Sequence, residues 1–169
     1  SNSEAMELDY LGAKENHHQT MGPAVEAQIP IYIRSTFEPD ARGTCISGDS
    51  GSEDPIKGIT SISGLAVVNV EGAGMIGVPG TAHRLFLALR QSDISVILIS
   101  QASSEHSICF VVNDDVAERA AAVVRGAFSE ETASGQIQDI ALTRACSVIA
   151  VVGDRMSGKP GVSGRFLHT

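Results

Sequence analysis

Tryptophan is missing from this 169-residue chain, and only 4% of its residues are aromatic. Basic residues are also scarce, because 12 lysines and arginines stand against 20 acidic residues, for a formal net charge of -8. Nucleic acid binding requires a concentrated basic face, so a nucleic acid partner is not expected. No apolar run is long enough to span a bilayer and no charged and then apolar leader opens the chain, so we expect no membrane partner.

Cysteine is sparse as well. Cys45, Cys109 and Cys146 are odd in number, far apart and without a C-x-x-C pair. This favours reduced thiols over a disulfide framework or a zinc site. The adjacent His17 and His18 have no second ligand cluster at metal spacing, so no metal site is expected. Apolar residues make up 43% of the chain, which is enough for one ordinary domain or two small ones.

The stretch 62–112 has the clearest pattern of secondary structure. It predicts a strand over 62–70, a glycine-rich loop over 71–80, a helix, a strand over 94–100, a polar turn and a strand over 107–112. The helix has an apolar stripe formed by Ala82, Leu85, Phe86 and Leu89. In the strand over 94–100 both faces are apolar near the middle.

The next residues predict a helix and a fourth strand. Asn113, Asp114 and Asp115 can cap the helix, whose buried stripe is formed by Val116, Ala120, Val123, Val124 and Ala127. A strand over 137–142 completes a β-α-β-β-α-β order, which is the ferredoxin-like arrangement of the α+β class. Upstream, the sequence predicts helices over 4–14 and 20–28, a strand over 29–33, a turn-rich stretch and a linker.

The end of the chain repeats the glycine loop and its helix. When Met75 is aligned with Met156, several pairs coincide: Gly72 with Gly153, Gly77 with Gly158, Pro79 with Pro160, Gly80 with Gly161 and Arg84 with Arg165. So many matches at one offset indicate two copies of one unit. The second copy stops inside its helix at Thr169, so we expect one complete unit and the start of another in a fragment of something longer.

Residues 72–77 match the G-x-G-x-x-G dinucleotide fingerprint, but Ser100 and Gln101 stand where an acidic residue should hold a ribose. A nicotinamide-binding enzyme is therefore disfavoured. The loop precedes a helix N-terminus, which attracts an anion such as the carboxylate of a free amino acid. The alternative is a turn that needs glycine for close packing. Gln101 can hydrogen-bond a ligand or only satisfy the turn. Residues 103–106 offer hydroxyl, carboxylate and imidazole groups, but four consecutive residues cannot converge as a catalytic triad.

Two segments resemble the first ACT domain of aspartate kinases, in particular that of threonine-sensitive bifunctional aspartate kinase–homoserine dehydrogenases. They are Val68-Asn-Val-Glu-Gly-Ala-Gly-Met-Ile-Gly-Val-Pro-Gly-Thr-Ala82 and Ile97-Leu-Ile-Ser-Gln-Ala-Ser-Ser-Glu-His-Ser-Ile-Cys-Phe-Val111. Residues 4–14, 29–44 and 148–166 resemble other parts of the same family. The resemblance implies the end of a kinase domain over 1–28, a strand and linker over 29–58, a first ACT domain over 59–143 and the truncated start of a second over 144–169.

The resemblance implies a regulatory fragment that binds an amino acid, with threonine as the effector of feedback inhibition. The alternatives are a lysine-sensing ACT domain and a structural module that only pairs subunits. The fragment should have no catalytic residues, no cofactor and no activity alone; ATP and magnesium would serve the parent kinase, and NADP a fused dehydrogenase. A homodimer through side-by-side ACT sheets is expected, in the cytoplasm or, for a plant-type parent, in a plastid.

The family also implies where the effector binds, at the loop and at the second strand. The matched positions are Gly74, Met75, Gly77, Val78, Pro79, Gly80, Thr81, Ala82, Ile99 and Gln101. Loop N–H groups would take the carboxylate of the ligand, strand carbonyls its ammonium, and Gln101 the hydroxyl of threonine. A site matched to a hydroxyl rejects analogues that lack it, because its own polar group is left unpaired.

Overall fold

A computed structural model describes residues 1–10, 18–48, 54–75, 78–101, 106–154, 156 and 158–168. The chain divides into two compact units, one of residues 63–148 and the other of residues 1–62 and 149–169. Within the described residues, none of the helices has the length and apolar character needed to cross a membrane.

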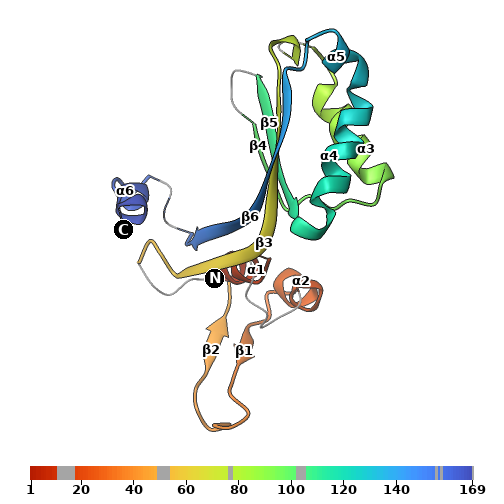
Figure 1. Cartoon of the computed structure of the whole chain (residues 1–169). Helices are drawn as coiled ribbons and strands as arrows, with labels where there is room; N and C mark the ends of the chain where they lie inside the picture. The colour runs from red at the N-terminus through yellow and green to blue at the C-terminus, as the bar shows by residue number, and fades with distance from the viewer. Residues whose placement is uncertain are drawn as a thin grey trace. The chain divides into compact units, whose positions relative to one another are not determined.

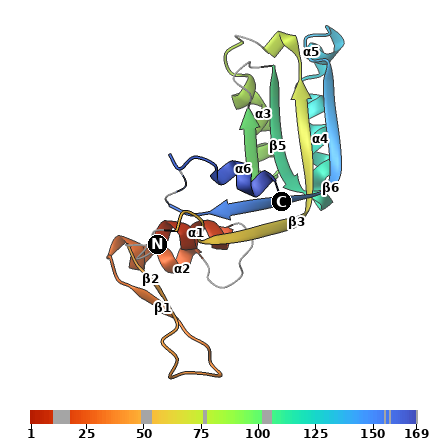
Figure 2. The same ribbon diagram turned by 90° about the vertical axis from the view of Figure 1, so that its left-hand side faces the viewer.

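The unit of residues 63–148 is a four-stranded sheet with helices on one face (Figure 1). Its elements are β3 (Gly58–Glu71) from residue 63 on, α3 (Thr81–Gln91), β4 (Leu98–Gln101), β5 (Ser107–Asn113), α4 (Ala117–Ala127) and β6 (Asp139–Val152) as far as residue 148. The strands lie in the order β4-β5-β3-β6, side by side in Figure 2, and β5 is antiparallel to both of its neighbours. The element order is β-α-β-β-α-β, so the predicted ferredoxin-like α+β fold is confirmed.

The core of this unit lies between the sheet and the two helices. The helical stripes predicted from the sequence are buried there, with Leu85 and Leu89 from α3 and Ala120 and Val124 from α4. Alternate residues of the central strands complete it: Ala66, Val68 and Val70 of β3, and Ile108, Phe110 and Val112 of β5. Each large side chain that is fully buried contributes about 1.5–3 kcal/mol through the hydrophobic effect.

Three elements of this unit differ from the prediction. β4 begins at Leu98 instead of Ile94, and its residues are exposed, so the apolar residues on its two faces are not buried as they would be in a central strand. A short helix, α5 (Ser129–Ala133), follows the buried Phe128 and was not predicted. β6 begins at Asp139 and continues to Val152, beyond the strand predicted over 137–142.

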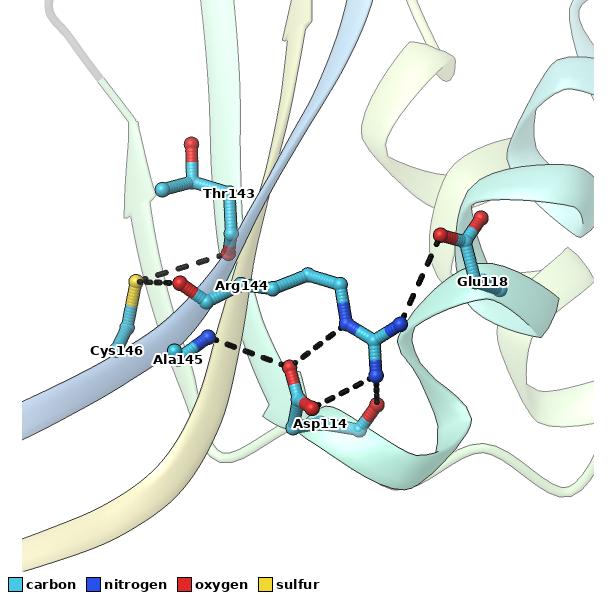
Figure 3. A network of polar contacts seen from close by, with 6 residues as sticks. All are labelled: Asp114, Glu118, Thr143, Arg144, Ala145 and Cys146. Atoms are coloured by element: carbon cyan, nitrogen blue, oxygen red, sulfur yellow. Dashed lines mark hydrogen bonds and ion pairs between the residues drawn. The ribbon is translucent and has the colours of Figure 1, made fainter.

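The predicted helix cap at residues 113–115 is instead a short 3-10 helix, η2 (Asp114–Val116), and the side chain of Asn113 makes no capping bond. The Asp114 carboxylate accepts hydrogen bonds from Arg144 Nε at 3.0 Å, Arg144 Nη2 at 2.7 Å and the N–H of Ala145 at 3.4 Å (Figure 3). The hydrogen bonds from Arg144 hold the pKa of Asp114 below its ordinary value. Because Ala145 has a φ of 55°, which is unfavourable for alanine, this network supports a strained position of β6.

The other unit contains two short helices, a hairpin and the end of the chain. Its elements are α1 (Asn2–Tyr10), α2 (His18–Glu26), β1 (Ile31–Ile33), β2 (Thr44–Ile46) and α6 (Val162–Leu167). Both N-terminal helices begin two residues before the predicted positions, and β2, which pairs with β1, was not predicted. The repeat extends to the backbone, because Gly80 and Gly161 have φ values of 88° and 83° directly before a helix. The predicted helical residues 11–14, His17 and residues 103–105 lie outside the described residues.

Two phenylalanines test the position of the core. Phe110 is fully buried and Phe37 is 96% exposed. We expect Phe110→Ala to lower the free energy of unfolding by about 3–5 kcal/mol through lost burial and a cavity. Phe37→Ala, the matched control, should change it by less than about 0.5 kcal/mol. Equilibrium urea denaturation followed by circular dichroism measures both, and equal effects would contradict this core.

Candidate functional site

The glycine loop between β3 and α3 packs directly against the backbone at residues 136 and 137. The N–H of Gly74 donates a hydrogen bond to the carbonyl of Gln136 at 3.0 Å. A Cβ atom at Gly72 would lie 2.7 Å from Ile137 Cα, and one at Gly74 would lie 2.8 Å from Gln136 Cα. Both distances are too short for real side chains, so close packing requires glycine at both positions.

The loop ends at Gly80, whose φ of 88° and ψ of 0° lie in the left-handed region that favours glycine. Since glycine has no side chain, it cannot cap α3, and the N–H groups of Thr81, Ala82 and His83 have no acceptor within the helix. The hydroxyl of Thr81 donates to the carbonyl of Val78 at 3.1 Å. These N–H groups and the positive end of the helix dipole favour an anion here.

A cavity of about 330 Å³ lies beside this turn. It is lined by Met75, Val78, Pro79, Gly80, Thr81 and Ala82, together with Gln101 of β4 and Ile108 of β5. Gln101 pairs with Ile108, and Ile108 pairs with Val70 of β3, so the register brings the end of β4 to the end of β3, from which the loop starts. Ligand pockets span roughly 300–1,000 Å³, so this cavity suits a small molecule. None of the described lining residues is acidic.

The structure brings together most of the residues predicted to bind the effector. Met75, Val78, Pro79, Gly80, Thr81, Ala82 and Gln101 all line this cavity. Gly74 lines a neighbouring cavity instead, Ile99 is exposed on β4 opposite Phe110, and Gly77 lies outside the described residues. The sequence reasoning missed Ile108, which only the register of β4 and β5 identifies. Binding by these residues stays a prediction.

Arg84, in the first turn of α3, ties the helix to α5. Its guanidinium forms an ion pair with Glu131 and donates a hydrogen bond to the carbonyl of Ala127 at 2.8 Å. It also lies 4.8 Å from the centre of the Phe128 ring. The hydrogen bond from Arg84 holds the pKa of Glu131 below its ordinary value.

The cysteines are free thiols, and burial raises the pKa of Cys109, which keeps this thiol protonated. In the part of the chain that the structure describes, no three His, Cys, Asp or Glu side chains are grouped as they would be to hold a metal ion.

Residues 68–128 match the family model of the ACT domain. Over 174 residues the chain is 41% identical to bifunctional aspartokinase/homoserine dehydrogenase 1, chloroplastic, of Arabidopsis thaliana, which covers 99% of this chain and 19% of that protein. It is 44% identical over 164 residues to bifunctional aspartokinase/homoserine dehydrogenase of Haemophilus influenzae, which covers 96% of this chain and 20% of that protein. The chain thus spans about a fifth of the length of these curated relatives.

Solved structures with a similar fold are aspartate kinases. The match to the aspartate kinase of Clostridium acetobutylicum covers 98% of this chain and 38% of the kinase chain, with a TM-score of 0.81 and 22% sequence identity. E. coli aspartokinase III in complex with lysine and aspartate matches 99% of this chain and 36% of its own with a TM-score of 0.72, also at 22% identity. At these identities the likeness shows the fold alone.

A matched pair of glycine substitutions tests the packing of the loop. In Gly72→Ala the new Cβ would meet the backbone of residue 137, so we expect the free energy of unfolding to fall by about 1–3 kcal/mol. Gly126→Ala places a Cβ in α4 where nothing lies within 4 Å, and should raise it by about 0.5–1 kcal/mol. Denaturant unfolding measures both, and a neutral Gly72→Ala would show that the loop does not lie against residue 137.

Proposed function

Since residues 68–128 form an ACT domain and nearly the whole chain is homologous to one region of the bifunctional aspartokinase/homoserine dehydrogenases, we propose that it is an allosteric sensor of threonine. Its effector cavity is the one beside Gly80. The observation that carries the proposal is that this cavity brings the first residues of α3, whose N–H groups have no acceptor within the helix, together with Gln101. In a parent aspartate kinase, the bound amino acid would mediate feedback inhibition, for which a coupling of about 1–3 kcal/mol is enough.

Under this proposal the carboxylate, the methyl group and the hydroxyl of threonine each have a partner in the cavity, and strand carbonyls take the α-ammonium. The carboxylate binds the N–H groups of Thr81 and Ala82, where the helix dipole adds to the attraction. The methyl group of threonine packs on the apolar side chains of Met75 and Ile108, which are buried. The amide of Gln101 hydrogen-bonds the hydroxyl, so an analogue without a hydroxyl leaves that amide without its partner.

The lining of the cavity favours threonine over lysine. One of the structurally similar proteins, E. coli aspartokinase III, was solved with lysine. The side-chain ammonium of a bound lysine needs an acidic partner or water, because an unpaired charge is costly to bury. None of the described residues that line the cavity is acidic. A neutral, hydroxylated side chain fits these surroundings better.

A dimerisation module is the second candidate function, and the exposed edge of the sheet favours it. β4 is the edge strand, and its apolar residues Leu98 and Ile99 are 39% and 53% exposed. An edge strand presents unpaired N–H and C=O groups that can pair with another strand. We propose that two copies of the chain pair side by side through this edge, which ends at the cavity residue Gln101. Ligand binding and pairing are compatible, so the second function does not exclude the first.

Isothermal titration calorimetry of the chain with threonine, valine, lysine and methionine tests the effector. We expect threonine to bind more tightly than valine, which has nearly the same shape without the hydroxyl. Gln101→Ala should weaken threonine binding about tenfold and remove most of the preference over valine, because one hydrogen bond to a polar ligand group is lost. Gln91→Ala, on the exposed end of α3, is the matched control and should change neither.

Two results would count against the proposal. If the folded chain gives no heat with any of the four amino acids, it is not a sensor of them, and the dimerisation module remains. If Gln101→Ala binds threonine as the unsubstituted chain does, Gln101 does not read the hydroxyl. A sedimentation measurement on the same samples reports the pairing separately.

A further inference from the structure

The glycine loop (residues 71–80) and the first turn of α3 that follows it are both attached to the same short segment, residues 127–137, which we call the clamp segment. At the start of the loop, the N–H of Gly74 donates to the carbonyl of Gln136 at 3.0 Å. Beyond its end, in the first turn of α3, Arg84 pairs with Glu131 and donates to the carbonyl of Ala127 at 2.8 Å. These partners lie 47 and 43 positions from Arg84, so the attachment depends on the tertiary fold.

Inside the clamp segment, the two attachment points are joined through Glu131. Its carboxylate holds Arg84, while its main-chain carbonyl accepts hydrogen bonds from the N–H groups of Gln136 at 2.8 Å and Ile137 at 3.1 Å. Phe128, under the Arg84 guanidinium, is almost fully buried and anchors the segment in the core. The start of the loop and the start of α3 are therefore held at a spacing that the clamp segment sets.

A second cavity, of about 160 Å³, lies between the later part of the loop and the clamp segment, beyond the contact of Gly72 and Gly74 with residues 136 and 137. Its walls are Gly74, Met75, Val78, Thr81, Arg84, Phe128, Glu131, Gln136 and Ile137. Met75, Val78 and Thr81 line this cavity and the effector cavity alike. A shift of these three residues toward the clamp segment would therefore enlarge the effector cavity, and there is room for such a shift.

We propose that Arg84 and Glu131 are positioning residues that set the shape of the effector cavity and thereby the affinity for its ligand. Neither is among the described residues that line that cavity, so they act through the loop. The inference rests on the proposed function for the identity of the ligand. It extends that function by assigning the control of affinity to an ion pair behind the loop.

The direction of the effect distinguishes positioning from simple charge. If Glu131 acted only through its negative charge, Glu131→Gln would leave the binding of the ligand carboxylate unchanged or strengthen it, because a repulsive charge has gone. If Glu131 positions the loop through Arg84, the same substitution loosens the loop and weakens binding. The two explanations predict opposite signs.

The test compares variants of the whole chain by calorimetry with threonine. Glu131→Gln and Arg84→Gln should each weaken binding about tenfold, a size that couplings through intermediate residues reach. The double variant should bind no more weakly than the weaker single variant, because the two residues act as one unit. Asp114→Asn is the matched control. It breaks an Arg–carboxylate pair of similar exposure, with side chains 49% and 30% exposed against 50% and 22%, away from the cavity, and should keep the full affinity.

A second measurement needs no ligand. Glu131→Gln should speed hydrogen exchange of the Gly74 amide, whose bond to Gln136 depends on the clamp segment, and leave the Ile97 amide, bonded to Val111, unchanged. Unchanged affinity in Glu131→Gln, or losses that multiply in the double variant, would overturn the inference while the threonine site stands. Absence of threonine binding by the unsubstituted chain would instead overturn the proposed function, and unchanged Gly74 exchange would then overturn the positioning role as well.

Discussion

Gly72 and Gly74 bring the loop so close to Gln136 and Ile137 that no side chain fits between the two backbones. This contact fixes the start of the loop, and the left-handed conformation of Gly80 fixes its end. Met75 and residues 78–80, which lie between these points, face the same cavity as the paired residues Gln101 and Ile108. The cavity lies between the loop and these paired residues. Backbone N–H groups of α3 line one side, apolar side chains line the rest, and the amide of Gln101 stands at the end of β4. Its position and its chemistry thus follow from two glycines that are needed for packing and one that is needed for a turn.

Under the proposed function, this arrangement would let a small domain recognise a free amino acid without charged side chains in its described lining. A helix N-terminus supplies donors and a positive potential for the carboxylate, and these cost no side-chain entropy to hold in place. Selectivity for threonine would then depend on few groups, because a single amide left unpaired would penalise a ligand that lacks the hydroxyl. The edge strand β4 ends at that amide, so the proposed ligand site and the proposed pairing edge lie at one end of the fold. That shared position would give a physical route from occupancy of the cavity to the association of subunits.

The sequence predicted the parts of the fold that depend on local periodicity. The stripes of α3 and α4 and the central strands β3 and β5 were correct because burial repeats at the period of the element. The predicted start of β4 at Ile94 was wrong. Residues 94–97 are as apolar as the residues of a typical strand, and only the pairing with β5 shows that β4 begins at Leu98. The loop residues of the cavity were predicted from the glycine pattern and the resemblance to a family. The role of Ile108 was not predicted, because it depends on the register of β4 and β5. The Arg84–Glu131 pair was not predicted either, because its residues lie 47 positions apart in the chain.

The most direct test of the account is a threonine titration followed by nuclear magnetic resonance of the backbone amides and the glutamine side chains. The account predicts that the largest shifts occur at the amides of Gly80, Thr81 and Ala82 and at the side chain of Gln101, while the surroundings of Asp114 and Arg144 stay unchanged. Shifts that spare the start of α3 and Gln101, or that cluster around Asp114, would contradict it.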